Sequence, residues 1–140
     1  MTYPIMVPAD IEALAVSYLT DVVAPTPVGT RLPSPAVAAD TVNGFLRVES
    51  AGGTKANIAE YDLNLIVHAY SPDEVAASLL ARHAVAALGA AAGLTIDGWY
   101  ITTTSNPVTP ARLTDPNVSL PRYRALCTWR VVGKQWAWGS

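Results

Sequence analysis

The sequence is poor in cysteine, histidine and charge, and each shortage excludes a class of protein. Cys127 is the only cysteine, which excludes an internal disulfide and a cysteine-based zinc cluster. His68 and His83 are the only histidines and have no partner at metal-ligand spacing, so no metal or other cofactor is expected. Charged residues make up 14% of the chain and hydrophobic residues 51%, which is typical of a packed domain. So little surface charge favours an oligomer.

Other absences bear on location and partners. The formal net charge of −2 argues against a general nucleic-acid binder, because affinity for the phosphate backbone comes from accumulated Lys and Arg. The N-terminus has no basic segment ahead of an apolar run, so we expect no signal peptide. The Ala-rich stretch 75–94 is broken by Arg82 and His83 and makes a poor membrane span. We therefore expect a chain that stays in the cytoplasm where it is made, without membrane contact.

Two helices are predicted. Residues 8–23 carry apolar side chains at three- and four-residue spacing, and two prolines follow, so this stretch predicts an amphipathic helix. Ser71 and Glu74 have the spacing of a capping box, and Pro72 suits the first position of a second helix. Gly93 suits the left-handed residue beyond the end of that helix.

Strands are predicted in the rest of the chain. Alternating apolar residues predict four strands, with at most one more short strand at 28–32; the four cover residues 44–50, 60–70, 98–104 and 122–132. Residues 105–121 contain four prolines and predict a long Pro-rich loop. The expected fold is a single α+β domain over residues 1–140. It has a mainly antiparallel sheet of about four to five strands, with two helices packed on one face.

Few residues suggest chemistry. There is no Gly-x-Ser-x-Gly elbow and no Cys/His signature, and Cys127 alternates with apolar residues as a buried thiol would. Glu60 and Asp62 project from the same side of one strand, which acid–base catalysis can use but which a solvated strand end explains better. Three arginines alternate on one face of the last strand, either as a solvated row or as a surface for an acidic neighbour or DNA: Arg122, Arg124 and Arg130.

Read in order, the chain resembles the tail terminator and tail completion proteins of siphophages, particularly those of phages that infect actinobacteria. The likeness covers nearly the whole chain and rests on layout more than on single residues. The segments that carry it are 10–19, 28–33, 45–53, 63–76 and 121–129.

The resemblance implies a structural protein, not an enzyme, that forms a hexameric ring at the head-proximal end of the tail tube. Its implied partners are further copies of itself, the major tail tube protein and a head–tail connector, with DNA passing through the ring unread. The implied location is the tail–neck region of the virion, after assembly in the host cytoplasm. The alternatives are a different neck protein, such as a head–tail connector, or a small cytoplasmic enzyme or ligand-binding domain.

Two sets of residues are candidates for contacts in such an assembly. The three arginines of the last strand are candidates for a polar surface or for the lumen of the ring. Because prolines keep a chain extended at low entropic cost, the segment 105–121 is the candidate arm toward a neighbouring ring subunit or the adjoining tail or neck protein. The alternative is a passive surface connection. Its candidate interface residues are Pro107, Val108, Pro110, Leu113, Pro116, Val118 and Leu120.

Overall fold

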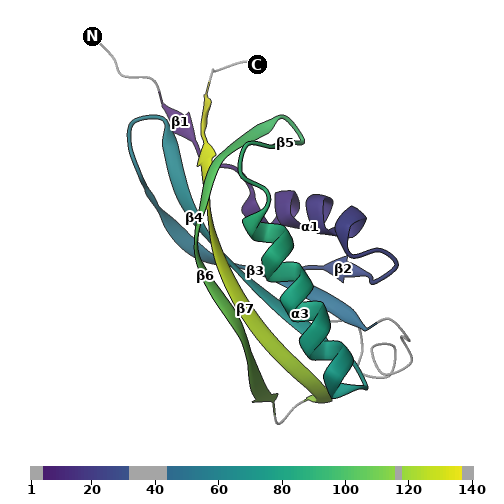
Figure 1. The fold of residues 1–140 in the computed structure, drawn as a ribbon. Coiled ribbons are helices and arrows are strands. Elements are labelled where there is room, and N and C mark those ends of the chain that lie inside the picture. Colours follow the sequence, from purple (N-terminus) through teal and green to yellow (C-terminus); the bar gives the residue numbers. More distant parts are fainter. Residues whose placement is uncertain (1–4, 32–43, 116–117, 137–140) are drawn as a thin grey trace.

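The computed structural model describes residues 5–31, 44–115 and 118–136. Two helices are present in this part of the chain, α1 (Ile11–Val22) and α3 (Glu74–Gly89). The strands, labelled in Figure 1, are β1 (Met6–Val7), β2 (Val28–Gly29), β3 (Phe45–Lys55), β4 (Glu60–Tyr70), β5 (Thr95–Ile96), β6 (Trp99–Asp115), β7 (Val118–Val132) and β8 (Lys134–Gln135).

The strands form two sheets. The larger has six strands in the order β2-β3-β4-β7-β6-β5, and β1 pairs with β8 in a separate two-stranded sheet. β2 runs parallel to β3, and the other neighbouring pairs are antiparallel. The predicted sheet of four to five strands was therefore wrong: the sheet is larger and mixed, and a second sheet is present. The missed strands have two residues each, which is too short to produce an alternating pattern.

The predicted Pro-rich loop at 105–121 was also wrong. β6 continues to Asp115 and pairs with β7, which begins at Val118. Among the described residues, the backbone of β6 has partners on its other side only at its start, where Trp99 and Tyr100 pair with β5 and Ile101 bonds the 93–94 segment, so most of it is an edge strand. Proline is tolerated on an edge because its missing N–H is not needed for pairing. The pairing shifts register around Val108, and this irregularity accommodates the prolines.

Aspartate caps both helices. The Asp10 carboxylate accepts from Ala13 N at the start of α1. At α3 the Asp73 carboxylate accepts from Val75 N, so the predicted cap at Ser71 was two residues early. Ser71 N instead donates to the Pro121 carbonyl, 3.4 Å away, and Glu74 bonds Tyr123 and Arg112. Competing partners on β6 and β7 thus displaced the local capping box.

The last turn of α3 is held by side chains from three other elements. Helix ends leave carbonyls without intrahelical donors, and α3 has no basic residue in its last turn to approach them. The Tyr18 hydroxyl donates to the Ala87 carbonyl at 2.7 Å, and Trp129 Nε1 donates to the Leu88 carbonyl at 2.9 Å. The Thr104 hydroxyl donates to the next carbonyl, that of Gly89, at 2.9 Å. These bonds fix α3 against α1, β6 and β7.

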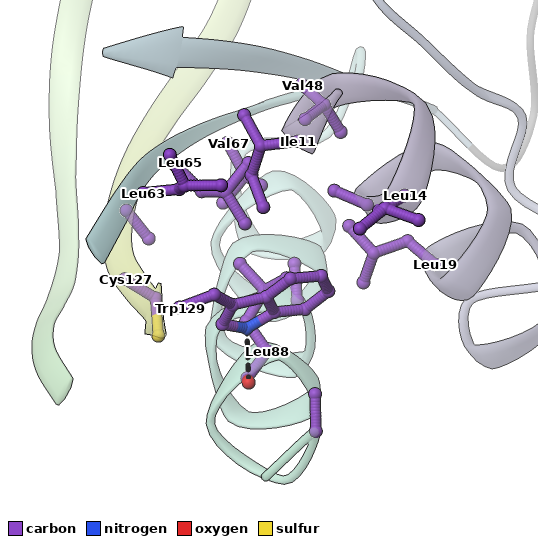
Figure 2. Packing of buried hydrophobic residues seen from close by; sticks show 14 of the residues in the cluster. Ile11, Leu14, Leu19, Val48, Leu63, Leu65, Val67, Leu88, Cys127 and Trp129 are labelled. Atoms are coloured by element: carbon purple, nitrogen blue, oxygen red, sulfur yellow. Dashed lines mark hydrogen bonds between the residues drawn. The ribbon is translucent and has the colours of Figure 1, made fainter. Parts of the chain in front are cut away.

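The core lies between the sheet and the two helices, which cover the same face of it (Figure 1). Trp129 is fully buried there and meets the Tyr18 ring edge-on, with ring centroids 5.8 Å apart. Figure 2 shows how residues of both helices and the inner side chains of the strands meet around it. Most inward residues of α3 are small, which lets this helix lie close to the sheet; they are Ala77, Ala81, Ala84 and Leu88.

Candidate functional site

The sheet face turned away from the helices is the candidate functional surface, and we call it the open face. Successive side chains of a strand point to opposite faces, so the neighbours of the core residues on β3, β4 and β7 project here. No described helix covers this face (Figure 1). Its residues, matched across the strands by their register, are Arg47, Glu49, Glu60, Asp62, Asn64, Ile66, His68, Arg122, Arg124, Leu126, Thr128 and Arg130.

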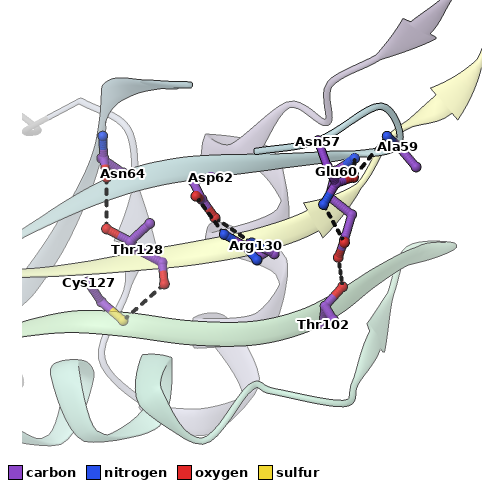
Figure 3. Close-up of polar contacts among 9 residues, drawn as sticks. All are labelled: Asn57, Ala59, Glu60, Asp62, Asn64, Thr102, Cys127, Thr128 and Arg130. Atoms are coloured by element: carbon purple, nitrogen blue, oxygen red, sulfur yellow. Dashed lines mark hydrogen bonds and ion pairs between the residues drawn. The ribbon is translucent and has the colours of Figure 1, made fainter. Parts of the chain in front are cut away.

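One end of the open face carries a ladder of polar pairs (Figure 3). Arg130 donates two bonds to the Asp62 carboxylate, at 2.8 and 3.0 Å, and lowers the pKa of that carboxyl. The Thr102 hydroxyl bonds the Glu60 carboxylate, and this bond together with one from Asn57 lowers the pKa of Glu60. Glu60 and Asp62, the two carboxylates that acid–base catalysis could use, are therefore kept ionised by hydrogen bonds within the subunit.

The other end is a cluster around a buried histidine. His68 is 5% exposed, and its Nε2 lies 2.9 Å from Glu49 Oε2, with Arg47 Nη2 3.4 Å from the same oxygen. Burial lowers the pKa of His68, and the hydrogen bond from His68 lowers the pKa of Glu49. The geometry therefore fits a neutral imidazole that donates to a carboxylate. Sequence reasoning missed this cluster, although Arg47 and Glu49 alternate on one strand.

Between these ends the open face is apolar. Ile66 on β4 lies opposite Leu126 on β7, which lies opposite Val108 on β6. Val108 is 48% exposed. Next to them is a hollow of about 290 Å³, lined among others by Ala51, Asn64, Asn106, Val108, Leu126 and Thr128. An apolar strip between charged ends is the composition of a protein–protein contact more than of a fully solvated sheet.

All three predicted arginines lie on the open face, and their surroundings differ. Arg130 is bound to Asp62, and Arg122 is half-buried. Arg124 is exposed and forms no ion pair with any residue that the structure describes. It stands between His68 on β4 and Ala111 on β6, beside the apolar strip. Among the described residues, Arg124 is thus the arginine of the three whose charge is available to a partner subunit.

The predicted interface residues are strand positions rather than parts of a free arm. Pro107 and Val108 are exposed on β6, while Pro110 and Leu113 are half-buried. Pro116 lies outside the described residues. Val118 and Leu120 are backbone positions of β7, and nothing is described of their side chains. Arg112 of the same segment forms an ion pair with Glu74 at 2.8 Å, which attaches β6 to the helix of its own subunit.

The residues considered for catalysis do not come together. Cys127 is buried on the helix side of the sheet, as predicted, and burial raises the pKa of its thiol. His68 projects from the open face, so the sheet separates it from Cys127. His83 is exposed on α3. Over residues 5–31, 44–115 and 118–136, no group of three or more His, Cys, Asp or Glu side chains is placed to hold a metal ion.

In the same part of the chain, neither helix has the length and apolar composition that a membrane crossing requires. No protein-family profile matches the chain, and no curated protein matches its sequence.

Proposed function

We propose that this chain is a structural subunit that assembles into a ring of six copies at the head-proximal end of a phage tail tube. The observation that carries the proposal is the open face. Its apolar strip at Ile66, Leu126 and Val108 lies between two polar ends, and no described element of the same chain covers it. Covering such a strip in an assembly removes apolar area from water, which favours association.

Low charge supports the same proposal. Only 14% of the residues are charged, and several of those on the open face are paired within the subunit, as at Asp62–Arg130 and Glu49–Arg47. Charges that already have partners cost less to bury in an interface than unpaired ones. The polar ends therefore suit the rim of a contact around an apolar centre.

The proposal extends to partners and location. The ring would end polymerisation of the tube protein and offer its other side to a head–tail connector, and genome DNA would pass through without sequence-specific binding. The protein would belong to the tail–neck region of the virion, and it would have no catalytic activity or cofactor of its own.

The test is reconstitution with the tail tube protein that the proposal gives as a partner. Tubes assembled with and without the protein are compared by electron microscopy for length and for density at their ends. The proposal expects shorter, uniform tubes that carry a ring at one end. A single copy or a two-fold dimer at the tube end would contradict the proposed ring, and binding only to purified connector would point to a different neck protein.

A further inference from the structure

On the helix side, the chain has a second surface that combines apolar and charged residues. Between the C-terminal half of α1 and β5 lies a hollow of about 420 Å³, which we call the α1–β5 hollow. Val22 and Leu94 in its lining are 48% and 42% exposed. The full lining is Ser17, Tyr18, Asp21, Val22, Leu94, Thr95, Ile96 and Asp97.

Two aspartates make the α1–β5 hollow acidic, and the local structure explains the position of Asp97 but not that of Asp21. Asp97 has a positive φ of 50° and precedes Gly98, the sequence expected of the tight turn between β5 and β6. Asp21 lies in the last turn of α1, where the negative end of the helix dipole disfavours a carboxylate. Asp21 is exposed and forms no ion pair or hydrogen bond among the described residues. Its position costs the free subunit stability, which points to a use outside the subunit.

The open face offers the complementary surface. Arg124 is exposed there, forms no ion pair within the described part of the chain, and lies next to the apolar pair Val108 and Leu126. Each surface therefore has two apolar side chains beside an exposed charge, and the charges are opposite. The hollow is lined from α1 and from residues at β5, and α1 lies on the sheet face opposite to the open face (Figure 1).

We propose that the α1–β5 hollow of one subunit receives the Val108–Leu126–Arg124 region of the next copy, with Arg124 facing Asp21. This inference rests on the proposed ring and names its contact surfaces. Because the two surfaces differ and lie on opposite sides, each subunit uses each of them once, which is the head-to-tail contact that a closed ring requires. The apolar pairs supply the association, and the charges select the partner surface.

The experiment exchanges the charges. Arg124→Glu and Asp21→Arg are each made in the full chain, and also together, with Arg82→Glu as a control for the charge change on an exposed part of α3 that lines neither hollow. Ring formation on tubes is scored by electron microscopy, and free protein is followed by analytical ultracentrifugation. Thermal unfolding should show that every variant folds; Asp21→Arg should keep or raise the melting temperature, because it removes an unfavourable charge from the helix end.

Each single exchange should lower ring occupancy at least tenfold, and the double variant should restore it. An equimolar mixture of the two single variants should also form rings, with 1:1 composition, because each mutant surface then meets its complement. Single variants that cap tubes like wild type, or a mixture and a double variant that both fail, would overturn the assigned surfaces while leaving the ring itself intact. A wild-type chain that forms no ring on any tube would instead overturn the proposed function, and this inference with it.

Discussion

The bond from Trp129 to the end of α3 gives a measurable test of how this fold is held together. Replacing Trp129 by Phe keeps an aromatic ring in the core but removes the donor to the Leu88 carbonyl. The lost bond should cost about 1 kcal/mol net. The smaller ring removes buried atoms worth about 1 to 2 kcal/mol, since each buried methylene-sized group contributes about 0.8 kcal/mol. We expect the free energy of unfolding to fall by about 2 to 3 kcal/mol.

Two matched variants separate the bond from the packing. Thr104→Val also removes a donor to a carbonyl in the last turn of α3, but that bond is exposed and water can replace it, so a loss of at most about 0.5 kcal/mol is expected. Tyr18→Phe keeps the ring and removes a part-buried donor to Ala87, with an expected loss of about 1 kcal/mol.

Urea denaturation of the free subunit measures all three, and the slope with denaturant should stay constant if only stability changes. Because the rings of Tyr18 and Trp129 are in contact, the double variant Tyr18→Phe/Trp129→Phe should deviate from additivity. A loss below about 1 kcal/mol for Trp129→Phe, or a loss equal to that of Thr104→Val, would refute the role given to the buried bond.

Three further predictions use glycine, histidine and cysteine. Gly44→Ala should destabilise the fold much more than Gly52→Ala. Both glycines have positive φ, but a Cβ at Gly44 would lie 2.4 Å from the Tyr70 carbonyl oxygen, whereas a Cβ at Gly52 would contact nothing. Equal denaturation midpoints for the two variants would contradict this. Burial lowers the pKa of His68 below its ordinary 6.5, so the unfolded chain binds a proton at a higher pH than the folded chain does. The stability should therefore fall as the pH drops below about 6.5. His68→Gln should weaken this pH dependence, and an unchanged pH profile of that variant would count against the prediction. Cys127 should resist alkylation at neutral pH until the protein unfolds, because it is buried and its thiol pKa is raised; rapid labelling of the native protein would disprove this.

Local sequence patterns predicted the long elements well. Residues 8–23 contain α1, and the alternation in residues 60–70 matches β4. Both stretches are long enough for their periodicity to outweigh other patterns. The burial of Cys127 followed from the same alternation on β7, since its neighbours Ala125 and Trp129 are buried with it.

The features that the sequence did not predict depend on contacts between residues far apart in the chain. The prolines of residues 105–121 indicated a loop, since proline is rare inside a sheet. Nothing in the local sequence shows that β6 is an edge strand, on which the N–H groups that proline lacks need no partner. Pairing of β1 with β8 joins the two ends of the described chain and has no local signal. The Arg47–Glu49–His68 cluster likewise forms only when β3 and β4 pair, so its residues looked like ordinary strand positions.

The alternation along β7 also separates stability from association. Ala125, Cys127 and Trp129 face the helices and are buried in the core, whereas Arg124 and Leu126 face the other way and contribute little to it. A surface used for assembly must tolerate exposure in the free subunit, so its residues cannot also be those that hold the fold. Within one strand the sheet satisfies both demands, because a shift of one residue moves a side chain from one face to the other. For this reason, reversing the charge at position 124 should leave the core intact, and thermal unfolding of Arg124→Glu measures this.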